Sequence, residues 1–278
     1  MHLPSRGVKT RNLVHPACSL AILLAAVLIT ACSNETGARK AVPLPYGEST
    51  VDVRNLEADF LTWWTYFSDS TTLSDDFVAL DSSLQKMAKQ SFLEELTTGK
   101  YIPLKLPSTD SNTYLQLHPL SPQADRSIAE TMVSKSNAVL DQFRMEGTAF
   151  PAFSWTTLDG QEFNNHNTRG KYLIVKCWFV ACQACIEEMP ELNALVAENQ
   201  DRDDIEFISL AYDSPEALRK FLQRREFTYL VAPVERDYLE SDLHVYNYPT
   251  HIVVDKGGVI KKVVNTVDEL KTALDKTL

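Results

Sequence analysis

Cys182 and Cys185 are separated by two residues and follow an apolar segment, residues 173–178, with the composition of a buried strand. The residues that start with Cys182 have an amphipathic pattern, which places one sulfur at the N-terminus of a helix and the other one turn further along. Backbone N–H groups and the helix dipole favour a thiolate at such a position. Because the thiolate is the species that attacks disulfides, this spacing predicts thiol–disulfide exchange.

A structural disulfide and half of a metal site are the alternatives for this cysteine pair. A zinc site would need two further ligands at suitable spacing. The chain has no second Cys-X-X-Cys pair, and its six histidines show no ligand spacing. We therefore predict no metal, and interpret Cys177 as an inert packing residue inside the strand. His251 could line the site, but an ordinary strand histidine is the favoured interpretation.

Further residues resemble a known family. The resemblance depends on Trp178, Cys182, Cys185, Glu188, Pro190 and Pro249, with the turn at residues 255–258. These positions are similar to the thioredoxin superfamily, and most closely to its envelope-located TlpA/ResA-like branch. The resemblance covers residues 148–278 and implies a mixed α/β thioredoxin-like redox domain. Residues 51–147 resemble the front part of lipoproteins in this branch, and we expect a small α+β domain of unknown role there.

The resemblance also implies roles for individual residues. Cys182 would attack a substrate disulfide, and Cys185 would resolve the mixed disulfide. The Tyr248-Pro249 bond would be cis and would place backbone beside the two cysteines, where a substrate strand can pair; a trans proline at a strand start is the alternative. Substrate contacts are predicted at Trp178, Tyr248, Pro249 and Thr250, although Tyr248 could equally be a packing residue.

Glu188 and Lys176 are predicted to act with the thiols. In the TlpA/ResA-like branch, the position of Glu188 carries an acid that tunes them; a solvated helix charge is the alternative. Lys176 replaces the acid that thioredoxins place six residues before the first cysteine, and strand alternation puts it on the face of Trp178. We hypothesise that Lys176 pairs with Glu188 and that the pair handles protons; otherwise Lys176 extends outward to water.

Residues 1–31 have the pattern of a targeting segment. A basic start is followed by an apolar run that is short for a membrane span, and residues 29–32 resemble a bacterial lipobox. This predicts a signal peptide, lipidation of Cys32 and a flexible tether over residues 32–50. An ordinary signal peptide or an uncleaved anchor is the alternative. Ser33 favours the outer membrane by family sorting habits, so we expect a periplasm-facing protein anchored in the cell envelope.

Periodicity and turn residues predict the elements around these sites. In the front domain we expect a helix over 82–96, a hairpin from 101–106 and 113–117, and a helix from Ser121 to about Arg144. In the redox domain we expect strands at 172–178, 205–212, 229–232, 252–254 and 259–264. Helices are expected from the cysteine pair to about Asn199, with a kink at Pro190, and at 214–224 and 267–277.

The charge of the chain and the motifs that its sequence lacks exclude several classes of partner and cofactor. A net charge of −10 argues against nucleic acid as a partner. No dinucleotide or phosphate-binding motif is present, so we expect no cofactor beyond the Cys182–Cys185 dithiol, with electrons from a membrane donor. The prediction is an envelope protein-disulfide reductase that acts on disulfide-bearing proteins. The alternatives are a peroxide-reducing enzyme, disfavoured because Phe179 replaces the required threonine, and a non-catalytic or copper-handling lipoprotein.

Overall fold

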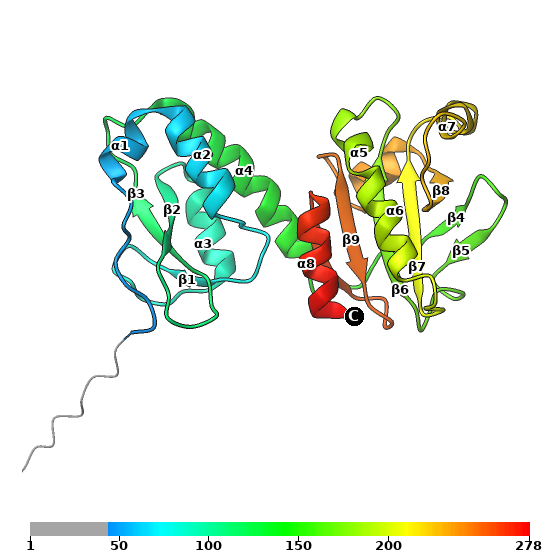
Figure 1. Cartoon of the computed structure of the whole chain (residues 1–278), viewed down its shortest axis with the longest axis horizontal. Helices are drawn as coiled ribbons and strands as arrows, with labels where there is room; N and C mark the ends of the chain where they lie inside the picture. The colour runs from blue at the N-terminus through cyan, green and yellow to red at the C-terminus, as the bar shows by residue number, and fades with distance from the viewer. Residues whose placement is uncertain (1–43) are drawn as a thin grey trace, which may run out of the picture. The chain divides into compact units, whose positions relative to one another are not determined.

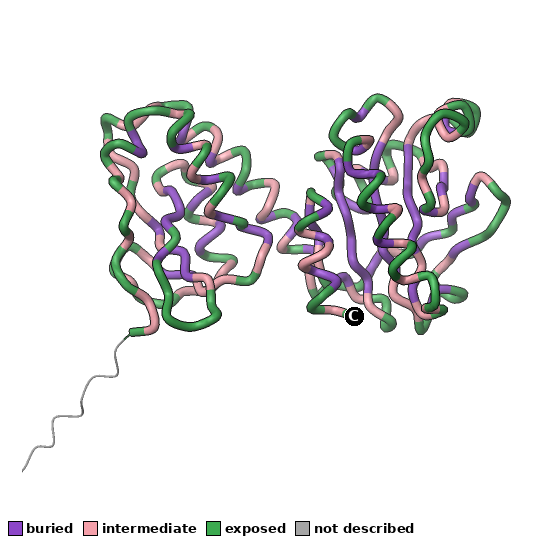
Figure 2. The backbone as a smooth tube through the Cα atoms, viewed as in Figure 1, coloured by how far each residue is buried: buried purple, intermediate pink, exposed green. Residues whose placement is uncertain are grey.

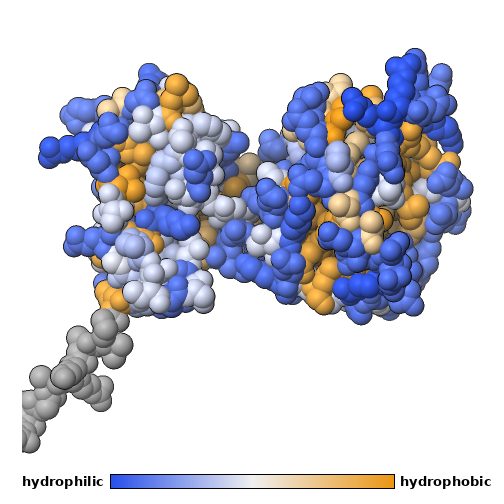
Figure 3. Space-filling view, viewed as in Figure 1, coloured by the Kyte–Doolittle hydropathy of each residue, from blue (hydrophilic) through white to orange (hydrophobic). Residues whose placement is uncertain are grey.

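The computed structural model describes residues 44–278. The predicted signal peptide, the lipidation site Cys32 and most of the tether over 32–50 lie outside the described residues. Leu44–Leu278 form one compact unit. Polar and charged side chains cover most of the face shown in Figure 3, with smaller hydrophobic patches between them. Within the described part of the chain, none of the helices has the length and apolar character needed to cross a membrane.

A five-stranded mixed sheet organises the second half of the chain, with the strand order β10-β9-β6-β7-β8 (Figure 1). Its strands are β6 (Tyr172–Trp178), β7 (Ile205–Ala211), β8 (Leu230–Pro233), β9 (Thr250–Val254) and β10 (Ile260–Val264). The three strands β6, β7 and β8 run parallel, whereas β9 is antiparallel to both β6 and β10. The expected mixed α/β thioredoxin-like fold is confirmed.

The helices of this half begin where the sequence supplies caps. They are α5 (Gln183–Glu187), α6 (Met189–Glu198), α7 (Pro215–Leu222), the π-helical turn η1 (Tyr238–Asp242) and α8 (Val267–Thr277). The break between α5 and α6 falls at Glu188, with Pro190 in the first turn of α6, as the predicted kink requires. The side chain of Ser214 accepts a hydrogen bond at the start of α7, and Thr266 with Glu269 forms a capping box at the start of α8.

Alternation along β6 separates two cores. Leu173, Val175 and Cys177 face a cluster that includes Trp155 and Phe163 from the small hairpin of β4 (Ser154–Thr156) and β5 (Glu162–Asn164). Side chains of the opposite set, residues 174, 176 and 178, face the side covered by α5, α6 and α8. Figure 2 shows the central strands buried along most of their length. Lys176 is therefore a cation in the middle of a buried strand.

The front region contains a three-stranded sheet of order β1-β3-β2 and four helices. Its elements are α1 (Val53–Ala58), α2 (Phe60–Ser70), β1 (Val78–Leu80), α3 (Lys89–Leu96), β2 (Tyr101–Leu106), β3 (Tyr114–Pro119) and α4 (Arg126–Met145). The predicted hairpin is present as the antiparallel pair β2–β3. Trp63 and Phe67 of α2 are buried in a core shared with α3 and α4.

Two predicted helix starts are wrong. The helix expected from residue 82 begins at Lys89, because Asp81 accepts hydrogen bonds from the backbone N–H groups of Ser83 and Gln85 and holds a turn. Leu84 in this turn has a φ of 62°, which is incompatible with a helix. The helix expected from Ser121 begins at Arg126, since Asp125 provides the cap and residues 121–124 form a turn.

α4 connects the front region to the redox half without interruption. Its residues Ile128 and Met132 lie in the front core, whereas Met145 in its last turn lies in the redox core. The backbone N–H of Gly147 then donates to the carbonyl of Ile260 in β10. The domain boundary between residues 147 and 148 stays a prediction. The helix α4 contributes side chains to both cores, so it links the front region to the half of the chain that carries the cysteine pair.

Candidate active site

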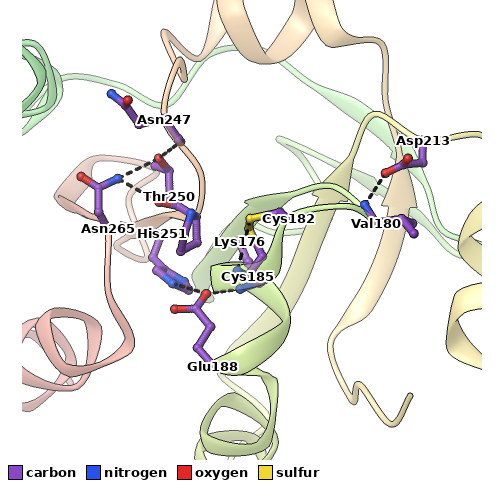
Figure 4. Close-up of a disulfide and its surroundings, with 11 residues drawn as sticks. Lys176, Val180, Cys182, Cys185, Glu188, Asp213, Asn247, Thr250, His251 and Asn265 are labelled. Atoms are coloured by element: carbon purple, nitrogen blue, oxygen red, sulfur yellow. Dashed lines mark hydrogen bonds and ion pairs between the residues drawn. A yellow bond between two sulfur atoms is a disulfide. The ribbon is translucent and has the colours of Figure 1, made fainter. Parts of the chain in front are cut away.

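Cys182 and Cys185 form a disulfide at the start of α5 (Figure 4). Cys182 is the N-cap residue, and its sulfur accepts a hydrogen bond from the backbone N–H of Cys185 at 3.2 Å. Cys182 is 7% exposed, whereas Cys185 is 0% exposed. Cys182 is therefore the less completely buried of the two residues, and a nucleophile paired with a resolving thiol needs this order of exposure.

The loop before Cys182 is held by hydrogen bonds to its neighbours. The backbone N–H of Val180 donates to Oδ2 of Asp213 at 2.7 Å, and the N–H of Cys182 donates to the carbonyl of Phe179 at 3.0 Å. Asp213 lies two residues after the end of β7, so the loop that follows β7 holds the loop that follows the neighbouring strand β6. The sequence analysis missed Asp213, because nothing local to residue 213 indicates a partner 33 residues away.

A buried charge cluster lies on the face of β6 covered by the cysteine-bearing helix. Lys176 Nζ makes an ion pair with Oε1 of Glu188, and Nε2 of His251 lies 3.0 Å from the same oxygen (Figure 4). All three residues are buried. The β6–β9 register places Lys176 directly opposite His251, and the helix break places Glu188 above them. The hypothesised Lys176–Glu188 pair is present, whereas His251 was only a minor candidate.

Burial and mutual contact set the charges in this cluster. Burial by itself raises the pKa of Glu188, but the contacts with His251 and Lys176 outweigh it, so the pKa lies below the usual range. Burial lowers the pKa of Lys176, with Glu188 opposing that effect. Burial also lowers the pKa of His251, so the imidazole is neutral at pH 7. The arrangement is a charged Lys176–Glu188 pair beside a neutral histidine.

Replacing His251 with glutamine is expected to reduce the loss of stability in acid. Because the folded-state pKa of His251 lies below its ordinary value of 6.5, the unfolded chain binds a proton that the folded chain does not as the pH falls below 6.5. The contribution of neutral His251 to the free energy of unfolding is fully present above pH 6.5. It is lost as the pH falls from 6.5 to the folded-state pKa. The wild-type free energy of unfolding should fall more steeply than that of the variant, by up to about 1.4 kcal/mol per pH unit.

Urea unfolding between about pH 5 and pH 8 measures this difference. Three neighbours set the charge environment of His251: Glu188, Lys176 and, from α8, Glu269. His166→Gln is the matched control, because His166 is exposed on a loop. Equal slopes for wild type and His251→Gln would contradict the assignment of a buried neutral imidazole.

The Tyr248-Pro249 peptide bond is cis. A chain of hydrogen bonds fixes the segment around it. Asn265 Nδ2 donates to the carbonyl of Pro249 at 2.9 Å and to Oγ1 of Thr250 at 3.1 Å, and Thr250 Oγ1 donates to the carbonyl of Asn247 at 2.7 Å (Figure 4). Thr250 is buried, so its hydroxyl serves this internal chain rather than an exposed surface.

Three half-buried aromatic side chains form a cluster beside the cysteine loop. The ring centroids of Phe179, Tyr212 and Tyr248 are 5.1 to 5.7 Å apart, and the Arg236 guanidinium lies 5.3 Å from the centre of the Tyr212 ring. Each ring comes from a different loop next to the sheet. Of the three, the sequence analysis singled out only Tyr248 as a candidate contact.

Two other residues singled out in the sequence are fully buried. Trp178 packs against Phe221 and Phe227, beneath the disulfide, and has no exposed surface, so it cannot contact a substrate directly in this structure. Burial raises the pKa of the Cys177 thiol to about 12, so this thiol is not ionised near pH 7. Cys177 faces the opposite core from the disulfide, as an inert packing residue would.

Among residues 44–278, the histidine, cysteine and carboxylate side chains make no group of three that could hold a metal ion. Cys182 and Cys185 are bonded to each other, and buried His251 lies with its Nε2 3.0 Å from Oε1 of Glu188.

Sequence comparisons match the redox half of the chain. Residues 147–263 match the model of the AhpC/TSA family. The thioredoxin-like protein YneN of Bacillus subtilis is 27% identical over 135 residues, which is 47% of this chain and 79% of that protein. The thiol-disulfide oxidoreductase ResA of Geobacillus thermodenitrificans is 27% identical over 46% of this chain and 76% of its own length. The thiol:disulfide interchange protein DsbE of Pseudomonas aeruginosa is 30% identical over 44% of this chain and 68% of its own length.

Proposed function

The chain belongs to the thioredoxin-like thiol–disulfide oxidoreductases that include DsbE, and from that premise we propose that it is a protein-disulfide reductase of the bacterial cell envelope. The observation that carries the proposal is the disulfide at the start of α5, in which Cys182 keeps 7% of its surface exposed and Cys185 has none. This asymmetry fits an enzyme that accepts disulfides from other proteins and resolves the intermediate internally.

The proposed reaction begins with the reduced dithiol. The Cys182 thiolate attacks one sulfur of a substrate disulfide; the substrate S–S bond breaks, a Cys182–substrate disulfide forms, and the other substrate sulfur leaves and takes up a proton. Cys185 then loses its proton and attacks the Cys182 sulfur. The internal disulfide reforms, and the substrate leaves as a dithiol that has gained two electrons. A membrane-bound thiol donor would reduce the internal disulfide again.

Lys176, Glu188 and His251 are proposed to manage the proton that Cys185 must lose. Cys185 is buried and belongs to the cluster of side chains that covers the Trp178 end of the same β6 face. A buried thiol ionises with difficulty unless a charge or an acceptor is near. The Lys176 ammonium would favour the thiolate, and Glu188 is the buried carboxylate that could carry the proton.

Substrate contact is proposed at the Tyr248–Pro249 segment and the neighbouring aromatic cluster. The Tyr248 backbone would pair with an extended substrate strand. The half-buried rings of Phe179 and Tyr212 would cover the apolar side chains that flank a substrate cysteine. Anchoring through lipidated Cys32, with the redox half facing the periplasm and the outer membrane favoured, would place the enzyme where disulfides persist.

Equilibration with glutathione tests the direction of electron flow. The reduction potential of the Cys182–Cys185 couple is measured on the chain without its predicted signal peptide, with Cys182→Ser as control. We expect a value near that of thioredoxin, about −270 mV, as for a reductase that needs an electron donor. A value near that of DsbA, about −120 mV, would contradict the direction and indicate an oxidant or isomerase.

A peroxide-reducing function is the second candidate, because residues 147–263 match the AhpC/TSA model. The structure places Phe179, an aromatic ring stacked on Tyr212, three residues before Cys182. A phenyl ring cannot hydrogen-bond a peroxide oxygen. Consumption of hydrogen peroxide by the reduced protein, compared with reduction of a protein disulfide, separates the two functions; faster peroxide turnover would overturn the reductase proposal.

A further inference from the structure

A relay of side-chain amides joins α4 to the segment around Pro249. The side chain of Gln142, in the last turns of α4, is buried, and its Nε2 donates to Oδ1 of Asn265 at 2.7 Å. Asn265 Nδ2 in turn donates to the carbonyl of Pro249 at 2.9 Å and to Thr250 at 3.1 Å. The relay spans 123 residues of sequence between Gln142 and Asn265.

Chemistry dictates the orientation of both amides. The Pro249 carbonyl can only accept, so Asn265 must present its nitrogen there. The side-chain oxygen of Asn265 then faces Gln142, and Gln142 must donate a hydrogen bond to it from Nε2. Thr250, held by the same Asn265 nitrogen, donates onward to the carbonyl of Asn247, so the relay fixes the chain on both sides of Tyr248. The hydrogen bond between α4 and Asn265 therefore requires a donor at position 142, and an acceptor cannot replace it.

We propose that Gln142 is a positioning residue for substrate binding, through which the front region sets the geometry of the Tyr248–Pro249 segment. This inference rests on the proposed reductase function. Gln142 acts through its hydrogen bond to Asn265, which it holds in the orientation that supports Pro249 and Thr250. The Tyr248 backbone is the group that a substrate strand would pair with, so its placement governs the binding of protein substrates.

Met145 supports the same conclusion from packing. It lies one turn after Gln142 and is buried in the core formed by β6, β7, β9 and η1. The carboxylate of Glu146, the next residue, accepts from the backbone N–H of Val263 in β10 at 3.4 Å. The end of α4 is thus fixed to the sheet at several points, so it can serve as a rigid base for the relay.

Gln142→Glu tests the proposal, because a carboxylate at this position can accept but cannot donate. It would turn the Asn265 amide around and direct its oxygen at the Pro249 carbonyl, which breaks both supporting bonds. Loss of these two hydrogen bonds predicts an increase of about tenfold in the KM for a disulfide-bonded protein substrate such as oxidised insulin. The kcat, the rate with a small disulfide such as oxidised glutathione, and the reduction potential should stay at wild-type values.

Two further variants distinguish loss of the hydrogen-bond donor at residue 142 from a general effect of an added negative charge. Gln142→Met removes the donor without reversing the amide, and should raise KM less than Gln142→Glu does. Gln123→Glu is the matched control, because Gln123 is exposed just before α4 and its oxygen remains an acceptor for Ser121. If Gln142→Glu does not fold at the assay temperature, the KM of Gln142→Met alone decides: a wild-type value overturns the proposal.

The outcomes separate this inference from the proposed function. Wild-type protein that reduces neither insulin nor oxidised glutathione would overturn the reductase function itself. An active wild type with unchanged KM in Gln142→Glu would overturn only the positioning role. A variant that loses activity with protein and small disulfides alike would also overturn it, because that pattern indicates general damage to the redox site.

Discussion

Cys182→Ser is expected to abolish reduction of protein disulfides, with a loss on the order of 10³-fold or more, because a serine hydroxyl is not ionised near pH 7 and cannot form the mixed disulfide. Cys185→Ser should give a different result. It keeps the less buried cysteine, Cys182, as the nucleophile and removes the fully buried resolving thiol, so the enzyme should accumulate as a covalent complex with its substrate. Non-reducing electrophoresis and mass spectrometry after mixing with oxidised insulin measure both outcomes.

Cys177→Ala is the matched control for these two variants. Cys177 lies in the same polypeptide segment but faces the opposite core, and burial raises its pKa to about 12. The control should keep wild-type activity and should lose only the stability that a small cavity costs, about 1 kcal/mol. Trapping by Cys182→Ser in place of Cys185→Ser would reverse the assigned roles. Loss of activity in Cys177→Ala would show that a third thiol takes part.

Lys176→Met is expected to destabilise the protein by about 3–5 kcal/mol, because it leaves the Glu188 carboxylate buried without its ammonium partner. The neutral His251 beside it cannot replace that charge. Glu188→Gln should be similarly costly, since it strands the Lys176 ammonium in the core. The double variant removes both charges and should recover a substantial part of the loss, since neutral replacements of a buried pair are often tolerated.

Urea unfolding of the two single variants and the double variant gives the coupling between Lys176 and Glu188. Lys171→Met is the matched control, because Lys171 pairs with Glu206 near the surface of the same sheet, and such pairs contribute about 0–1 kcal/mol. Additive losses in the double variant would contradict a buried, mutually dependent pair.

The same variants test the proton-handling role. If Glu188 carries the proton of Cys185, Glu188→Gln should slow resolution of a preformed mixed disulfide by about 10²-fold at neutral pH. The deficit should shrink as the pH rises, because hydroxide then removes the proton without help. Single-turnover release of a fluorescent thiol measures resolution apart from the first attack. Full activity in both Lys176→Met and Glu188→Gln would contradict the role.

Local signals predicted the redox half well. The buried run at β6, the helix start at Ser214, and the break near Pro190 each depend on neighbouring residues, which a sequence displays directly. The two wrong helix starts have local causes as well, namely the aspartate-centred turn at Asp81 and the cap at Asp125. Serine and aspartate compete for the same capping positions, and composition alone does not decide between them.

The relations within the site depended on register and on distant contacts. His251 meets Lys176 only because β9 pairs with β6 in one particular register; a shift by one residue would turn His251 to the opposite face. Strand alternation and helix spacing placed Lys176 and Glu188 near each other, but no local pattern links Gln142 to Asn265. The support for the Pro249 segment therefore had no signal in the sequence that periodicity or motif analysis could detect.

The location of Cys177 has a consequence for how the chain acquires its disulfide. The described residues contain three cysteines, so an oxidising compartment could join them in three ways. A bond from Cys177 to either partner would have to pull its side chain through the central strand, because its sulfur lies on the opposite side of the sheet. A mispaired chain therefore cannot complete β6 and should remain unfolded and open to thiol exchange. The sheet can close only while Cys177 is unpaired, whether Cys182 and Cys185 form a disulfide or a dithiol, so folding itself selects against the two pairings that involve Cys177.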